Sequence, residues 1–344
     1  MTPAEREIER RRKVLKRLDN RGLQSVAKSY RAVLRDLTTR LSGVTQLITR
    51  ARAQGEEVSE GWLARQGRYQ TLIAQHEALT LDFLRAAMAT IEGVKDEAID
   101  LAHADAPALT TAAMGPAPAD ALARVQSSFS RLPSDQLNRL LHNAADERPL
   151  GSLLLEVVPE STQAVKDAMA SGVARGAGVR DIARDVRVAS GMAQQRALLI
   201  SRTEVIRAYR ETSRELYERS PAVKGWLWWA EVNACPVCSA EHGSEHDLSE
   251  TLDSHPSCRC TMLPVTLSWR ELGYDLPDGR PALQSGSERF AGLAEADKLA
   301  IVGRARLDAY NAGEITLQDM VRETRHPRWG AGKRVATLRE LELV

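Results

Sequence analysis

The sequence predicts a mostly helical α+β protein, in which a long N-terminal helical arm or bundle precedes a smaller α+β module with a Cys/His knot. Three observations lead to this fold class. No proline lies between Pro3 and Pro107, so long helices are permitted there. Ten of the 15 aromatic residues fall after residue 200, so the two ends of the chain are built differently. All four cysteines lie between Cys235 and Cys260.

Length and composition fit a soluble globular protein. The 344 residues allow one large domain or two ordinary ones, and 43% are hydrophobic and 27% charged. A net charge of +1 excludes a protein that binds polyanions over its whole surface. No apolar run is long enough to span a bilayer, and no apolar stretch follows the N-terminal charges. We therefore expect no membrane span, no secretory signal and synthesis in the cytoplasm.

Residues 1–104 carry the strongest helical pattern. Apolar residues recur there at steps of three and four in two stretches, one around residues 23–48 and one around 62–94. We expect two or three long antiparallel helices in a bundle or hairpin. Helical stripes left exposed are expected to mediate self-association. His76 lies on an apolar stripe, which favours a packed core histidine over a ligand.

The middle of the chain predicts shorter elements. Residues 105–120 are rich in Ala and Pro and almost uncharged, which indicates an extended linker. Helices are expected near 120–128, 134–146 and 160–173, with a short strand or buried connector at 151–158. The stretch from about 174 to 220 predicts two helices broken at Ser190-Gly191.

Arg202 lies on the apolar stripe of the second of these helices. A buried guanidinium needs a partner, because an unpaired charge is costly to desolvate. In a purely structural role, the Arg202 guanidinium extends to the surface or pairs with a backbone carbonyl. In a functional role, it makes a fixed electrostatic contact in a cleft. We expect Arg202 and Glu204 to form a buried polar network that ties this helix to the sheet. Three tryptophans at 226, 228 and 229 predict a strand there.

The cysteine pattern predicts a metal site. Cys235-x-x-Cys238 lets two thiolates reach one ion from a tight turn, and Cys258-x-Cys260 supplies a second pair. His255 precedes the second pair. In a reducing compartment this clustering indicates structural zinc, held by four cysteines or by three with His255 as an alternative ligand. Disulfides or free thiols are the alternative.

A catalytic zinc would need an open coordination position and a nearby general base. Glu241, Glu245 and His246 are the candidates for this base by their location between the two Cys pairs.

Residues 163–266 resemble the phage Mu F-like, or phage head-morphogenesis, family of minor head proteins. A looser resemblance extends through the tail to residue 344. The resemblance rests on a set of motifs in a fixed order: Ile200-Ser201-Arg202-Thr203-Glu204, Lys224-Gly225-Trp226, Cys235-x-x-Cys238, Gly243, His255-Pro256-x-Cys258-Arg259-Cys260, Pro264-Val265 and, in the tail, Phe290, Gly292-Leu293, Ile301-Val302-Gly303, Gly313-Glu314-Ile315 and Trp329-Gly330.

We expect four regions: a helical bundle or hairpin (1–104), a linker (105–120), an α+β domain with the Cys cluster (121–266), which the resemblance identifies as head-morphogenesis-like, and a C-terminal helical tail segment (267–344). The resemblance further implies a minor capsid protein in low copy number, made in the bacterial host cytoplasm. Such a protein lies in the virion head interior or at the portal vertex. It acts structurally in head assembly, in contact with portal or major capsid protein and with packaging-related partners.

Two other functions stay open. One is a metal-dependent enzyme or toxin-like effector, a nuclease or transferase delivered with the DNA. We expect no enzyme, because the sequence has no Walker-type loop, nucleophile elbow or His-Glu-x-x-His motif. The other is a sequence-independent nucleic-acid-binding zinc module, although the loop between the Cys pairs is acidic.

A basic cluster, Arg10, Arg11, Arg12 and Lys13, could contact packaged DNA non-specifically or an acidic partner surface. The alternative is a solvated helix face, because acidic residues at positions 5, 7 and 9 offset its charge.

Overall fold

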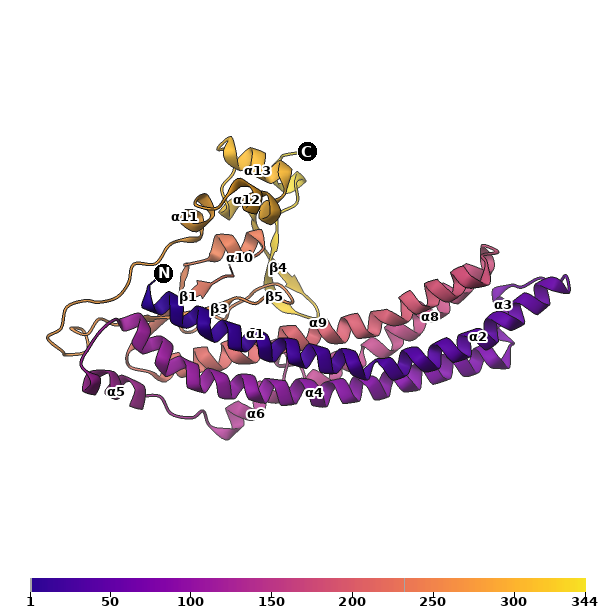
Figure 1. Cartoon of the computed structure of the whole chain (residues 1–344), viewed down its shortest axis with the longest axis horizontal. Helices are drawn as coiled ribbons and strands as arrows, with labels where there is room; N and C mark the ends of the chain where they lie inside the picture. Colours follow the sequence, from indigo (N-terminus) through magenta and orange to yellow (C-terminus); the bar gives the residue numbers. More distant parts are fainter. Residues whose placement is uncertain (1, 232) are drawn as a thin grey trace. The chain divides into compact units, whose positions relative to one another are not determined.

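The structure is a computed structural model that describes residues 2–231 and 233–344. Long helices dominate its N-terminal third, as the sequence predicted (Figure 1). They are α1 (Pro3–Ser29), α2 (Arg31–Ala53), α3 (Glu60–Ala64) and α4 (Gly67–Met114). The buried positions of α2 recur every three or four residues, so one stripe of the helix forms core and the rest is polar.

The expected extended linker at 105–120 is wrong for residues 105–114. These residues complete α4, which has Pro107 inside it. A proline inside a helix removes one backbone hydrogen bond. The helix continues because the surrounding alanines are good helix formers and Ala106 and Leu109 are buried in hydrophobic clusters.

The regular elements between residues 115 and 219 are helices. They are α5 (Ala119–Ser127), α6 (Ser134–His142), η1 (Ala145–Glu147), α7 (Leu150–Leu155), α8 (Val157–Ala174) and α9 (Val179–Arg219). The expected strand or connector at 151–158 is instead the end of α7 and the start of α8, whose buried leucines and valines pack as helix faces.

The expected break at Ser190-Gly191 is also wrong, because α9 runs through it without interruption. Glycine in a helix interior costs about 1 kcal/mol relative to alanine. Packing offsets this cost here, since Ser190 is fully buried and its carbonyl accepts a hydrogen bond from the Tyr30 hydroxyl.

The strands lie late in the chain. A three-stranded antiparallel sheet has the order β2-β1-β3, built from β1 (Val223–Trp229), β2 (Glu245–His246) and β3 (Thr261–Thr266). The short helix α10 (Pro236–Glu241) lies between β1 and β2 in the sequence. The predicted tryptophan strand is β1, and Trp226 and Trp228 are fully buried.

The tail is not only helical. Its helices α11 (Gly286–Ala291), α12 (Glu295–Val302) and α13 (Arg304–Asn311) are followed by a hairpin of β4 (Val321–His326) and β5 (Gly330–Val335), flanked by η2 (Gln318–Met320) and η3 (Arg339–Leu341). The hairpin was missed because its strands are mostly polar and glycine-rich, without the alternating apolar residues that mark a half-buried strand.

The chain forms two compact units that are discontinuous in sequence. The first contains the residues up to Asp19, Lys95–Leu141 and Thr203–Val344, and the second contains Asn20–Val94 and His142–Arg202. The helices α1, α4 and α9 each contribute to both units. These units do not follow the boundaries expected at 104, 120 and 266.

Each unit has its own core. The second unit buries apolar residues of α2, α4, α8 and α9, among them Val44, Ile48 and Met169. His76 is buried there with its Nε2 3.2 Å from the Ser161 hydroxyl, which fits the packed core histidine expected. The first unit buries the sheet tryptophans with Tyr217 and Cys238. Among the described residues, no helix is both long enough and apolar enough to cross a membrane.

Candidate metal centre

The first half of the site is the start of α10. Cys235 precedes the helix and Pro236 occupies its first turn, where a proline loses no hydrogen bond. Cys238 follows three residues later, so both sulfurs lie on the same side of the turn. Cys238 is buried and Cys235 half-buried.

The second half is a tight turn just before β3. The Cys258 backbone N–H donates to the His255 carbonyl at 3.2 Å, which closes the turn over Pro256 and Ser257. Ser257 has a φ of 63°, in the left-handed region that few non-glycine residues adopt. Its N–H donates to the Thr203 hydroxyl at 3.0 Å, which helps to hold this conformation. The turn thereby directs His255 and Cys258 toward α10.

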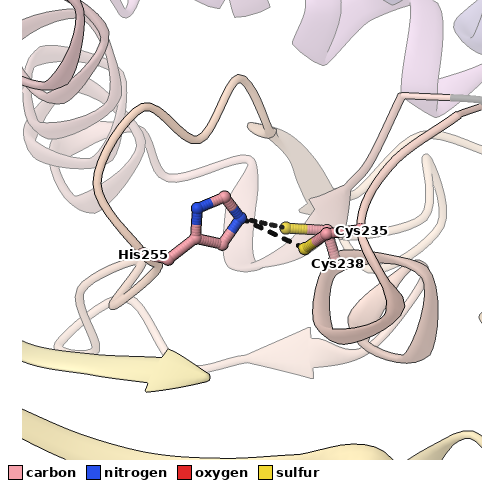
Figure 2. A group of neighbouring side chains, drawn as sticks. All are labelled: Cys235, Cys238 and His255. Carbon is pink, nitrogen blue, oxygen red and sulfur yellow. Dashed lines mark hydrogen bonds between the residues drawn. The ribbon is translucent and has the colours of Figure 1, made fainter. Parts of the chain in front are cut away.

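The ligand atoms of the two halves converge. The His255 Nε2 lies 3.2 Å from the Cys235 sulfur and 3.4 Å from the Cys238 sulfur (Figure 2). The Cys238 sulfur lies 3.6 Å from that of Cys258. Two sets of ligand atoms within 4.8 Å share Cys238, one with Cys235 and His255 and the other with Cys258 and Cys260.

Each of these three pairs has the spacing of two ligands on one zinc ion. With Zn–S bonds of about 2.3 Å and a Zn–N bond of about 2.0 Å, two sulfurs lie about 3.8 Å apart and sulfur and nitrogen about 3.5 Å apart. The distances in the structure agree with both values to within a few tenths of an ångström. Thiolate sulfur and imidazole nitrogen are also the donors that zinc prefers.

Five donors are available for four positions. The His255 Nε2 is within 3.4 Å of two cysteine sulfurs, so it is placed as a ligand. Its other ring nitrogen, Nδ1, lies 2.9 Å from the Pro256 carbonyl, and such a bond orients a metal-binding histidine. Cys260 lies with Cys238 and Cys258 in the second set, and its backbone N–H donates to the Cys258 sulfur at 3.4 Å. Cys238 belongs to both sets, and among the described residues no four of the five donors lie within 4.8 Å of one another, so the ligand set stays a prediction.

The site pairs a thiolate with a histidine that keeps its proton. The pKa of Cys235 is lowered to about 5, because the Cys238 thiol and His255 hydrogen bond to its sulfur. The same contact with Cys235 raises the pKa of His255 to about 10. Cysteine binds metals as the thiolate. The His255 imidazole must lose its proton in order to bind a metal.

A comparison with known protein families matches the segment that contains this site. A family model, described as Phage Mu protein F like protein, matches part of the chain. Residues 163–263 belong to the match. It includes all five candidate ligands and confirms the resemblance seen in the sequence over this part of the chain. The match indicates a protein of phage head morphogenesis. Comparisons with curated proteins and with solved structures gave no match.

A buried arginine in the Mu F-like segment supports the turn. Arg210, on α9, donates to the carbonyls of Cys260 and Cys258 at 2.7 and 3.0 Å and to the Ser254 hydroxyl at 2.9 Å. Burial alone would raise the pKa of Cys258, but hydrogen bonds from neighbouring thiols and the charge of Arg210 lower it. Sequence reasoning singled out Arg202 and missed Arg210, although Arg210 follows the buried Ile206 by one helical turn.

The predicted network of Arg202 and Glu204 stays a prediction. Glu204 is fully buried and pairs with Arg207, one turn later on α9, at 2.9 Å. Arg202 is half-buried. The two residues fall in different compact units.

The basic cluster of α1 is largely engaged within the first unit. Arg11 pairs with the buried Asp105, and Arg12 is buried and pairs with Glu9 at 2.8 Å. Arg10 pairs with Glu7, and Lys13 is exposed. Contact of this cluster with DNA or a partner stays a prediction.

Two of the three candidate general bases are engaged elsewhere. Glu241 is buried and pairs with Lys333 at 2.8 Å. The His246 ring stacks on Trp226 with centroids 4.2 Å apart, and its Nδ1 lies 3.0 Å from Glu250. Glu245 is exposed on β2.

Proposed function

We propose that the protein is a minor head protein of a tailed phage or phage-like particle and acts structurally in head assembly. The match over residues 163–263 carries this proposal. Its partners are the portal protein, the major capsid protein or both, and it lies in the head interior or at the portal vertex. The long N-terminal helices provide surface for self-association.

We further propose that the Cys/His site holds structural zinc. Cys235 and Cys238 from the start of α10 would bind it together with Cys258 and His255 from the turn before β3. A bound zinc ion would crosslink these two segments and add its binding energy to the stability of the fold. The site is enclosed by short elements around a small sheet, where such a crosslink contributes most.

A structural role is favoured over a catalytic one by the number of donors. A catalytic zinc keeps one position open for water or substrate, whereas five protein donors compete here for four positions. The carboxylate of Glu241 is held by Lys333 rather than available as a base. A metal-dependent enzyme or toxin-like effector would need both features, so it is the weaker alternative.

The test is quantitative mass spectrometry of purified particles, with the major capsid protein as the internal standard. A few copies per portal are expected. Consistent absence from mature particles contradicts the head role. Metal analysis of the purified protein tests the second proposal, with one zinc per chain expected, and a metal-free protein that retains its native fold contradicts it.

A further inference from the structure

The C-terminal tail closes its own hydrophobic core on α10, the helix that supplies two of the candidate metal ligands. Ala240, near the end of α10, is buried in one cluster with residues of the tail, among them Phe290 and Leu307. The helix α10 contacts α11, η2 and both strands of the β4–β5 hairpin (Figure 1). The tail therefore packs directly against the first half of the metal centre.

Gly286, the first residue of α11, lies against the backbone of α10. A Cβ atom at this position would lie 2.1 Å from the Ser239 carbonyl oxygen and 2.9 Å from that of Ala240, whereas real Cβ atoms essentially never approach within 3.0 Å. These oxygens belong to the backbone, so they cannot turn aside as a flexible side chain can. Only glycine allows the two helices to meet in this way, and a larger residue must push α11 away from α10.

Two side chains of the tail hold the end of α10. The Lys333 ammonium on β5 pairs with Glu241 at 2.8 Å, and the two side chains are only 19% and 7% exposed. The Gln318 amide in η2 donates to the Ala240 carbonyl at 3.2 Å. A carbonyl in the last turn of a helix has no partner within the helix, so this bond satisfies it. Contacts from three tail elements, α11, η2 and β5, thereby fix the end of α10.

The same tail also contacts the second half of the metal centre. A Cβ atom on Gly332, in β5, would lie 2.7 Å from the carbonyl oxygen of Ser254, the residue before His255. The ammonium of Lys333, the next residue of the strand, lies 5.5 Å from the centroid of the Trp228 ring. One strand thus contacts both ligand-bearing segments, α10 through Lys333 and the turn before β3 through Gly332.

The position of these two segments matters because metal affinity depends on ligand spacing. The His255 Nε2 lies 3.2 Å from the Cys235 sulfur, and metal–ligand distances tolerate deviations of only about 0.2 Å. A shift of α10 by about 1 Å relative to the turn exceeds this tolerance several times. Contacts that fix both segments therefore contribute to metal affinity, although the residues that make them are not ligands.

We propose that tail residues 285–335 brace the metal centre, with Gly286 and Lys333 as positioning residues, and that zinc binding and tail docking stabilise each other. The inference rests on the zinc site proposed above. Coupling between two binding events is reciprocal, so zinc should also hold the tail in place. The match to the Mu F-like family ends at residue 263, so the brace lies in a part of the chain outside the match.

The test compares two alanine substitutions at opposite ends of α11 in the full-length protein. Gly286→Ala forces a Cβ atom into the backbone of α10. Gly292→Ala is the matched control, because a Cβ atom there would lie 3.6 Å from its nearest neighbour, an ordinary contact. Zinc affinity is measured by competition with a chromophoric chelator, and circular dichroism establishes that each variant is folded. Lys333→Met replaces Gly286→Ala if that variant does not fold.

Limited digestion with trypsin provides the reciprocal measurement. Arg304 is exposed on α13, and cleavage after this residue is followed with zinc bound and after chelation. Zinc should slow the cleavage in the wild type and in Gly292→Ala, and most of this protection should be lost in Gly286→Ala. A contribution of Gly286 to overall stability alone would change the cleavage rate equally with and without zinc.

The expected result is a zinc affinity about tenfold or more lower for Gly286→Ala, with the control within about twofold of the wild type. If the wild type binds zinc and Gly286→Ala stays within about twofold of it, the brace is wrong and the zinc site stands. Equal losses in both variants, or tail cleavage in the wild type that zinc does not slow, have the same meaning. A wild-type protein that binds no zinc contradicts the zinc site and with it this inference.

Discussion

Replacing Arg210 with methionine is the most direct test of how the metal centre is held. The substitution keeps an apolar stem in a position that is only 5% exposed. It removes all three hydrogen bonds from the guanidinium to the turn, namely those to Cys260, Cys258 and Ser254. Three acceptors that Arg210 satisfies therefore lose a strong donor.

The expected magnitude follows from these contacts. A hydrogen bond to a charged group contributes about 1.5–3 kcal/mol, and such contributions are not additive within one network. Leaving a buried acceptor without its donor costs about 1–3 kcal/mol. Loss of groups that orient metal ligands lowers metal affinity by about 10–100-fold. We expect Arg210→Met to fall within these ranges.

The assay is competition for zinc with a chromophoric chelator, together with urea unfolding followed by tryptophan fluorescence. Trp226 and Trp228 lie in the same core cluster as Cys258 and Cys260, so they report on the module. Arg219→Met is the matched control, because Arg219 is an exposed residue at the end of the same helix and should change stability by less than about 0.5 kcal/mol. A chelator midpoint for Arg210→Met within twofold of wild type would refute the reasoning.

Three further predictions concern single side chains. Cys260→Ser should retain one zinc per chain, whereas Cys258→Ser should lose it, and equal loss in metal analysis would show that Cys260 is a ligand. Cys238→Ser should make residues 223–265 sensitive to limited proteolysis and leave the N-terminal helices resistant; equal resistance in both regions would contradict this. Burial lowers the pKa of His76 to about 4. Since an unfolded histidine titrates near 6.5, the unfolded chain gains a proton first on acidification, and stability is lost as pH falls from about 6.5 toward 4. His76→Gln should remove about 2 kcal/mol of the stability difference between about pH 7 and pH 5 in urea unfolding, and an unchanged difference would contradict the assignment.

The elements that could be predicted are those that a short segment of the sequence specifies without contacts from elsewhere. The apolar periodicity of α2 and the tryptophans of β1 each specify an element within one short segment. The Cys-x-x-Cys spacing likewise predicts that Cys235 and Cys238 lie on one turn of chain, at the start of α10. In these cases propensity and packing favour the same structure, so sequence reasoning succeeds.

The predictions were wrong where contacts between residues far apart in the sequence determine the local structure. Pro107 and Gly191 are both unfavourable inside helices, yet α4 and α9 run through them because long-range packing offsets the local cost. Arg210 could not be assigned to the metal centre, because the turn that it binds lies about 50 residues away in sequence. The choice of His255 as a ligand likewise needed the distances between the two segments.

The discontinuous first unit has a consequence for synthesis on the ribosome. Ile8 is buried in one hydrophobic cluster with Leu109, Trp229 and Leu263, so the beginning of α1 completes a core of which two residues are translated more than 200 residues later. Until they emerge, this hydrophobic cluster is incomplete. The core of this unit can therefore be completed only after its late segment has been synthesised.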